Sequence, residues 1–507
     1  MSVIKNSGLI SVGTLLSKIF GFLREVVMAL VFGASRLTDA YLVAQVVPSL
    51  LFSLVGNSLS TIIVPLITEY EQTKGRNYAL AFANAITTIV LLITILLTII
   101  GIIVTSWLIA LIAPGFEEEA KELACRLSRI MFPMIIFWGF AGIATGLLHS
   151  QKRFFYPAFM GLPFNIVIIS SVLILGRRWG IEGLAWGTVA AVAAQWLFQV
   201  LDVRKCGYHF RVLLKHPGIN QVGKLILPVL IGSGAAQLGI VVDRILASGL
   251  VEGSIAALNF ASRLNELALG LFSTAVASAL YPELAQKATG GERESFRRLL
   301  ANSLLGLTWL MVPMAVGIIV LREPLVRLAF ERGAFDARAT ELTAYALFFF
   351  ALGIPATALR DIVVRGFYAV QDTMTPMWIG IATVGANIAL NIILVRYLAL
   401  GGLALGTSGA VTIGFIILLW CLRRKLGHLN GQLLIRDGGK ILVASALMGV
   451  IATKLASWVL TRFGDIPSII AVATVGCLIY FLSCRLLNIG IYLAVVNRMK
   501  ALTLKMR

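Results

Sequence analysis

Residues 85–107, AITTIVLLITILLTIIGIIVTSW, decide the class of fold, because none of these side chains carries a charge. A helix of about 20 apolar residues crosses the roughly 30 Å of hydrocarbon in a bilayer. Residues 378–395 form a second uncharged stretch. Neither stretch alternates apolar and polar side chains as a transmembrane barrel does. The sequence therefore predicts an all-α integral membrane protein.

Composition supports this prediction over the whole chain. Of the 507 residues, 59% are hydrophobic and 13% are charged, whereas a soluble domain has roughly 45–50% and about 25%. Hydropathy predicts about 14 transmembrane helices. They cover residues 8–33, 39–68, 78–111, 122–148, 155–176, 181–203, 221–249, 254–286, 297–321, 339–369, 375–396, 401–422, 438–461 and 466–487.

Charge distribution predicts the orientation. With the N-terminus inside, basic residues such as Arg204, Lys205, Arg423 and Arg424 fall in inside loops, and the acidic run at 117–122 falls outside. This bias predicts that both termini are cytoplasmic. It also explains the net charge of +19 without nucleic-acid binding. We expect the first apolar stretch to be retained as a helix, since no signal-peptide cleavage site follows it.

An internal repeat predicts the domain organisation. The sequence GLAWGT at 183–188 recurs as GLALGT at 402–407, and Pro157 matches Pro376 at the same offset of 219. At offset 220, Gln151 matches Gln371. Such a repeat covers six helices, an even number, so its copies are parallel. We predict two six-helix lobes, 1–215 and 216–430, around a central cleft, and two additional helices in 431–507.

Ionisable residues inside predicted spans indicate a water-filled site, because each costs roughly 2.5–3.5 kcal/mol at the centre of a membrane helix. They are Lys18, Arg24, Glu25, Asp243, Arg244, Arg263, Glu266, Arg360, Asp361 and Arg365. Oppositely charged neighbours could instead be structural ion pairs. Lys18 and Arg24 leave the first helix net cationic, however, which favours an anionic ligand. Arginine matches phosphate oxygens bidentately, so a pyrophosphate is the predicted ligand.

A second polar set lies in the second lobe. Asn387 and Asn391 share a helix face, Thr407 lies on the next helix, and Asp243 belongs to the seventh helix. One carboxylate with neutral oxygens suits Na⁺. Interhelical hydrogen bonding is the alternative role for membrane Asn and Thr, and on spacing alone it is the more common one.

The motifs taken together resemble the MurJ/MviN family of lipid II flippases. Residues 17–25, SKIFGFLRE, resemble the family pattern S-[RK]-x-x-G-x-x-R-[DE]. Further similarities follow in order along most of the chain: FGA at 32–34, DAY at 39–41, RLNE at 263–266, GFYA at 366–369 and QD at 371–372.

The resemblance implies specific roles. Lys18, Arg24 and Arg263 would bind the lipid-linked pyrophosphate, Glu266 would orient Arg263, and Asp39 would serve an outer gate. The sodium site of some members would be matched by Asp243, Asn387, Asn391 and Thr407. Sodium would be the one metal, and no other cofactor is expected. The two C-terminal helices would hold the polyprenyl tail. Lipid II and membrane lipids would be the partners, in the bacterial inner membrane.

The chain departs from the family in the second helix. Positions that usually carry arginine are Leu51 and Phe52, and the acidic residue expected ahead of Gly56 is also missing. The substrate could therefore be another polyprenyl-linked glycan. A multidrug or cation antiporter of the same superfamily is a second alternative, which the cationic first helix disfavours. A membrane enzyme is the third, and the short loops without clustered catalytic groups argue against catalysis.

Overall fold

Helices are the only regular secondary structure in the described part of the computed structural model, which covers residues 2–290, 292–428 and 431–494. Only the backbone is described for 2–9, 11, 52–61, 224, 226–233, 235–236, 271–279 and 281. A helix satisfies its own backbone hydrogen bonds, which lipid cannot do. Large apolar side chains accordingly face outward, for example Ile103 at 72% exposure and Trp107 at 67%. The prediction of an all-α membrane protein is confirmed.

Packing divides the chain into two units, which are Met1–Ala256 with Arg332–Asp336, and Ala257–Glu331 with Ala337–Arg507. The first unit holds α1 (Ser2–Phe32), α2 (Arg36–Lys74), α3 (Arg76–Ile112), α4 (Glu118–Met131), α5 (Met134–Ser150), α6 (Phe155–Phe159), α7 (Gly161–Lys205), α8 (Gly218–Ser248) and the first turn of α9 (Ser254–Thr289).

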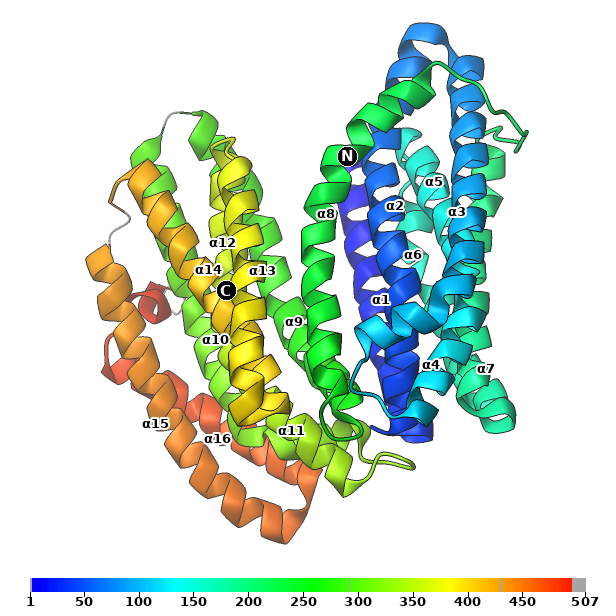
Figure 1. Ribbon diagram of the computed structural model, residues 1–507. Helices are drawn as coiled ribbons and strands as arrows, with labels where there is room; N and C mark the ends of the chain where they lie inside the picture. The colour runs from blue at the N-terminus through cyan, green and yellow to red at the C-terminus, as the bar shows by residue number, and fades with distance from the viewer. Residues whose placement is uncertain (1, 291, 429–430, 495–507) are drawn as a thin grey trace. The chain divides into compact units, whose positions relative to one another are not determined.

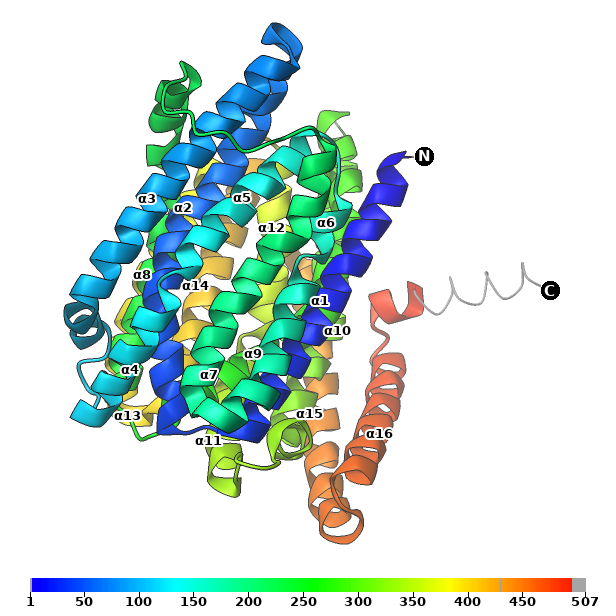
Figure 2. The ribbon, with the colours of Figure 1, turned by 90° about the vertical axis from the view of Figure 1, so that its right-hand side faces the viewer.

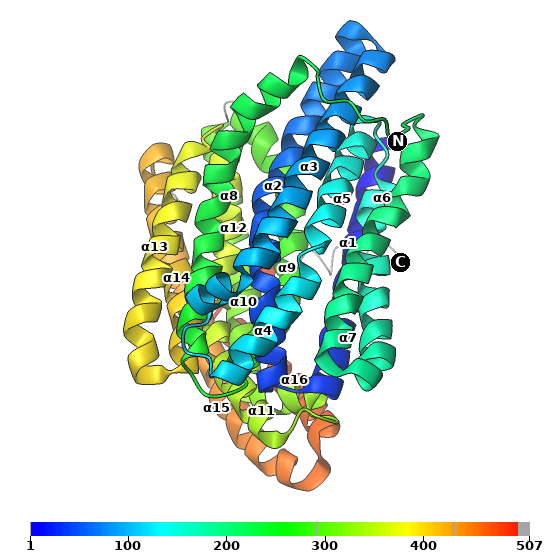
Figure 3. The same ribbon diagram turned by 45° about the vertical axis from the view of Figure 1, so that its right-hand side comes forward.

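In the first unit, α1 runs beside α6 and α7 (Figure 2). Helix α2 packs against α3, α4, α5 and α8 (Figure 3). An apolar core with Ile63, Phe82 and Leu148 lies between α2, α3 and α5. Helices α4 and α5 meet at a bend of 42°, and α7 breaks at Gly180, whose φ of 59° is in the left-handed region that glycine favours.

The second unit holds the rest of α9, then α10 (Arg293–Phe330), α11 (Ala337–Leu352), α12 (Ile354–Ala369), α13 (Met374–Leu398), α14 (Leu400–Leu426), α15 (Gly431–Phe463) and α16 (Asp465–Leu486). Its core joins α9, α10, α12 and α14 through side chains such as Phe296, Ile362 and Leu422. Helices α15 and α16 pack against each other and against α10 (Figure 1).

Helix boundaries repeat at the same interval as the sequence. The bent pair α4–α5 begins at Glu118 and ends at Ser150, and the pair α11–α12, bent by 41°, begins at Ala337 and ends at Ala369, 219 residues later. The break at Gly180 recurs at Ala399, which has a φ of 45°. The two halves of the chain thus repeat their breaks as well as their motifs.

All 14 predicted spans fall on helices, with single helices, bent pairs or the two halves of α7 accounting for each. Seven helices of the described chain are long and apolar enough to cross a membrane by themselves, and nine if each bent pair is one span. Helices α1, α2, α8 and α9, which carry Arg24, Asp39, Asp243 and Arg263, include residues of which only the backbone is described, and the count does not extend to those residues.

The boundary between the packing units lies at Ala256, beyond the lobe boundary that the repeat predicts at residue 215. The physical reason is that α8, the first helix of the predicted second lobe, packs against α2 and α3. The lobe limits 1–215, 216–430 and 431–507, and the cleft, stay predictions. Residues 495–507 of the last range lie outside the described chain.

Candidate functional site

The face of α1 that carries Arg24 packs against α6 and α7. An ideal Cβ on Gly13 would lie 2.8 Å from the Ala158 carbonyl oxygen, and one on Gly161 would lie 2.8 Å from Ser17 Oγ. Small residues therefore let these helices approach closely, as in other membrane proteins. This contact determines the environment of the Arg24 side chain.

Three neighbours hold the Arg24 guanidinium. Its Nη2 donates to Glu25 Oε1 at 2.6 Å, and its Nη1 donates to Asn165 Oδ1 at 3.3 Å. The Phe164 ring centroid lies 5.7 Å from Cζ. The Asn165 amide is itself fixed, because Nδ2 donates to the Gly161 carbonyl at 2.8 Å. Arg24 is therefore partly buried and preorganised between α1 and α7.

Lys18 lies elsewhere on α1. Its side chain is exposed and makes no ion pair within the described part of the chain. Six residues at 3.6 per turn separate it from Arg24 by about 120° around the helix. The two predicted ligands of pyrophosphate thus differ in environment.

Asp39 caps the start of α9. Its Oδ1 accepts the Ala256 N–H at 2.7 Å and its Oδ2 accepts the Gly253 N–H at 2.8 Å. The first N–H groups of a helix have no intrahelical acceptor, so this carboxylate satisfies two of them. Asp39 is only 5% exposed. Its carboxylate is thus committed to the backbone in this conformation.

Arg263 and Glu266 form a neighbouring pair on α9. Arg263 Nη1 donates to Glu266 Oε2 at 2.7 Å, and the side chains are 42% and 55% exposed. The Ser262 hydroxyl lies 3.5 Å from Glu266 Oε1. The i,i+3 spacing predicted this contact, and Glu266 is placed to orient the guanidinium.

Three members of the predicted cation set lie together where α13 meets α14. Asn387 Nδ2 donates to Thr407 Oγ1 at 3.3 Å, and Asn391 Nδ2 donates to Asn387 Oδ1 at 3.4 Å. Gly406 lets Asn391 approach, because a Cβ there would lie 1.9 Å from Asn391 Oδ1. The Asn387–Thr407 bond is of the interhelical kind that the sequence offered as the alternative role, whereas the Asn391–Asn387 bond lies within α13.

Asp243, the fourth member of that set, belongs to α8 and so to the first unit. It interacts with other residues of the chain. Among the positions that depart from the family pattern, Leu51 is partly buried. The side chain of Phe52 lies outside the described residues.

The sequence did not predict two neighbours of Arg24, namely Asn165 and Phe164. The available signal was an amide inside the otherwise apolar span 155–176. Membrane amides usually have a hydrogen-bonding partner, but the sequence does not say which helix supplies it.

Comparison with known proteins adds to this geometry. A family model described as lipid II flippase MurJ matches residues 28–473. A probable lipid II flippase MurJ from Rhizobium tropici is 30% identical, covering 98% of this chain and 96% of its own length. A lipid II flippase MurJ from Burkholderia cenocepacia is 29% identical, covering 81% and 82%.

Solved structures show the same relationship. A lipid II flippase MurJ in an inward closed conformation superimposes with a TM-score of 0.80 at 27% identity, covering 94% of this chain and 98% of its own. An inward-facing multidrug resistance transporter of the MATE family shares the fold, with a TM-score of 0.67 at 16% identity and coverage of 82% and 96%.

Proposed function

The chain belongs to the lipid II flippase MurJ family, and from this we propose that it translocates lipid II, a polyprenyl-diphosphate-linked peptidoglycan precursor, from the cytoplasmic to the outer leaflet. We further propose a bacterial inner-membrane location with both termini cytoplasmic. The inside bias of Lys and Arg supports this orientation.

The observation that carries the proposal is the exposed ion pair on α9. Arg263 and Glu266 are about half exposed within a membrane helix, where charge needs water or a ligand rather than lipid. Arg24 adds a preorganised guanidinium on α1, and Lys18 adds an exposed ammonium. Together they would replace the hydration that a diphosphate loses on leaving the cytoplasm.

The mechanism needs no covalent chemistry. Binding of the diphosphate to Lys18, Arg24 and Arg263, reorientation of the lobes, and release complete one transfer, with Asp39 releasing or capping α9 at the outer end. The membrane potential or a cation gradient would reset the cycle. If Na⁺ is the coupling ion, Asn387, Asn391 and Thr407 would supply neutral oxygens and Asp243 the carboxylate.

The polyprenyl tail would remain in an apolar environment. A cavity of about 380 Å³ lies between α10, α15 and α16, lined by side chains such as Trp309, Met314, Met448 and Phe481. Its lining side chains are mostly apolar, as the polyprenyl tail requires. We propose that this groove, formed with the two C-terminal helices, accommodates part of the tail.

A depletion experiment tests the function. In a bacterium whose own lipid II flippase is depleted and replaced by this chain, an externally added lipid II-degrading enzyme should reach labelled lipid II. Arg263→Ala should abolish that access while inserting normally, because it removes a charge that stabilises the diphosphate. Arg24→Ala should abolish access for the same reason, and it also removes the Arg24 partner of the buried Glu25 carboxylate. Arg298→Ala, which alters an exposed arginine at 68% side-chain exposure on α10, is the matched control.

Two results would contradict the proposal. If lipid II stays protected from the enzyme in depleted cells that express this chain, the chain moves another polyprenyl-linked glycan, as the absence of the α2 arginines allows. Normal access with both arginine variants would refute their roles even if the chain is a lipid II flippase.

A further inference from the structure

In the first repeat, a polar pair fills the space between the end of α2 and the end of α5. Gln151 Nε2 donates to Glu71 Oε2 at 2.6 Å. Nearby, Arg76, the first residue of α3, donates from Nη2 to the Cys206 carbonyl at 2.6 Å. These two contacts join the end of α2 to the end of α5, and the start of α3 to the end of α7.

The second repeat has lost that pair. Pro65 and Pro282 are 217 residues apart, and at this offset Glu71 corresponds to Ala288. Backbone hydrogen bonds at the ends of α5 and α12 repeat at offset 219, since Gln151 N donates to Leu147 O and Val370 N donates to Gly366 O. Val370, not the Gln371 matched by sequence at 220, is therefore the counterpart of Gln151.

The arginine contact has also moved. Arg76 corresponds to Arg293 at offset 217, and both begin their helices. The carbonyl of Leu426, the counterpart of Cys206, accepts instead from Arg297 Nη2. Arg297 stands at the position of Leu80. Arg297 therefore makes the carbonyl contact in the second repeat that Arg76 makes in the first, and Arg293 is left for another contact.

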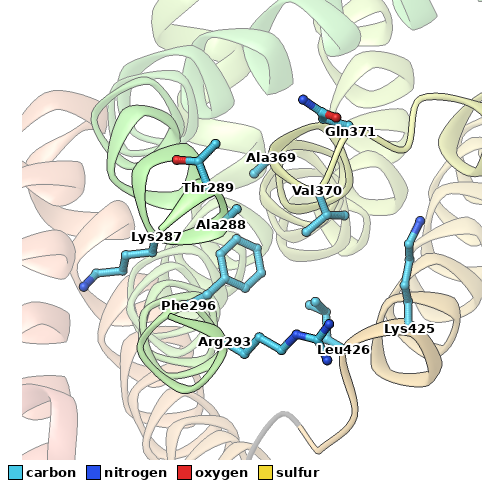
Figure 4. Close-up of a pocket in the computed structure, with 10 residues that line it drawn as sticks. All are labelled: Lys287, Ala288, Thr289, Arg293, Phe296, Ala369, Val370, Gln371, Lys425 and Leu426. Carbon is cyan, nitrogen blue, oxygen red and sulfur yellow. The ribbon is translucent and has the colours of Figure 1, made fainter. Parts of the chain in front are cut away.

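A pocket of about 390 Å³ results from these changes. Ala288 and Val370 line it, together with the basic residues Lys287, Arg293 and Lys425. Figure 4 shows Arg293 extending from α10 toward Leu426, with Ala288 and Val370 on neighbouring helices. None of the described residues that line it is Asp or Glu.

Partners of the three cations differ. Lys425 Nζ lies 2.7 Å from Asp372 Oδ2, and Lys287 Nζ lies 3.6 Å from Glu292 Oε2. Arg293 has no ion pair within the described ranges of the chain. Lys287 and Lys425 lie in the last turns of their helices, where the helix dipole favours cations.

Helix stability does not explain Arg293. It is the first residue of α10, and the positive end of a helix dipole disfavours a cation there. A ligand of opposite charge would account for both its position and its lack of an ion pair. Arginine binds phosphate oxygens with two parallel N–H donors, and lysine adds a point charge.

We propose that this pocket binds a phosphate-bearing anion, separately from the diphosphate site on α1 and α9. The anion would take the place of the Glu71 carboxylate, with Arg293 as its main ligand and Lys287 and Lys425 adding positive potential. Either an anionic phospholipid headgroup or a soluble phosphate compound has this chemistry.

Two probes distinguish these sources, both applied to the full chain. In nanodiscs, native mass spectrometry measures retained phosphatidylglycerol against phosphatidylcholine. In detergent, ³¹P NMR line broadening measures binding of inorganic phosphate. Arg293→Gln should weaken the bound ligand about tenfold or more, the usual effect of losing a charge-assisted hydrogen bond.

A second variant restores the first repeat. Ala288→Glu with Val370→Gln should form the Glu71–Gln151 type of pair, place a carboxylate beside Arg293 and displace the anion. Arg298→Gln, on the same helix but outside the pocket, should bind like wild type.

Each result decides the proposal. Loss of phosphatidylglycerol retention in both pocket variants identifies a lipid headgroup, and loss of phosphate broadening identifies a soluble ligand. If neither probe distinguishes the pocket variants from wild type and Arg298→Gln, the pocket is not an anion site.

Discussion

The buried carboxylate of Glu25 shows how one residue makes a charge tolerable in a membrane helix. Glu25 is 2% exposed, and it accepts from Arg24 at 2.6 Å. Removing one partner of a buried pair leaves an uncompensated charge, which costs several kcal/mol. The guanidinium of Arg24 and the carboxylate of Glu25 therefore compensate each other's charge on α1.

We expect Glu25→Gln to destabilise the protein by about 3 kcal/mol, measured as unfolding in mixed micelles with increasing sodium dodecyl sulfate. Glu266→Gln removes a comparable but half-exposed partner and should cost less than about 1 kcal/mol. Equal losses in the two variants would contradict the role of burial.

Between α12 and α13, Asp372 is a pH-sensitive residue. The hydrogen bond from Lys425, followed by that from the Thr375 N–H, lowers the pKa of Asp372 from 3.8 to about 2. A folded-state pKa below the unfolded value means that ionised Asp372 stabilises the protein above about pH 4. This contribution is lost as the pH falls from about 4 to about 2.

Asp372→Asn should therefore lower stability at pH 7 by about 1–2 kcal/mol, a range that allows for the half-exposed Lys425 ammonium. The difference from wild type should shrink toward pH 2, measured by thermal unfolding in detergent across this range. A difference that does not change with pH would show that the ion pair is not responsible.

At the scale of elements, α13 and α14 depend on one glycine for their contact. A Cβ on Gly406 would lie 1.9 Å from Asn391 Oδ1, whereas a Cβ on Gly380 of α13 meets nothing within 4 Å. The same device recurs at Gly187, where a Cβ would lie 2.2 Å from Ser171 Cβ. Close approach, not backbone flexibility, is the reason for these glycines.

Gly406→Ala should separate α13 from α14 and lower the thermal unfolding midpoint, at a cost of about 2 kcal/mol or more from overpacking. Gly380→Ala should be neutral or stabilising by up to about 1 kcal/mol, because alanine favours the helix. The pair of variants has the same chemistry, so a loss of stability in both would point to lipid contact instead of packing between α13 and α14.

At the scale of the whole molecule, the orientation remains to be tested. The basic loops and the acidic run at 117–122 predict opposite sides of the membrane for the start of α4 and the start of α10. In a cysteine-free background, Glu119→Cys should react with a membrane-impermeant maleimide in intact cells.

Arg298→Cys should react only after the cells are permeabilised, since its helix end is predicted to be cytoplasmic. Both positions are exposed in the structure, so access to the reagent depends on the side of the membrane. The reverse labelling pattern would show that the N-terminus is outside.

The sequence by itself determined the fold class, the helix ranges, the repeat and the family. These depend on local properties. An uncharged stretch long enough to cross a bilayer must be helical, and the residue spacing of a motif can be recognised without knowing the tertiary structure. The pairs Arg263–Glu266 and Asn387–Asn391 were also predictable, because residues three or four apart share a helix face.

Only the tertiary structure decided which helices supply the remaining partners. Asn165 lies 141 residues from Arg24, and Asp39 binds the backbone of Gly253 and Ala256. The anion pocket arises because Ala288 and Val370 fail to form a contact that Glu71 and Gln151 make. Such contacts join residues distant in the chain, and their geometry comes from helix packing, which no local pattern specifies.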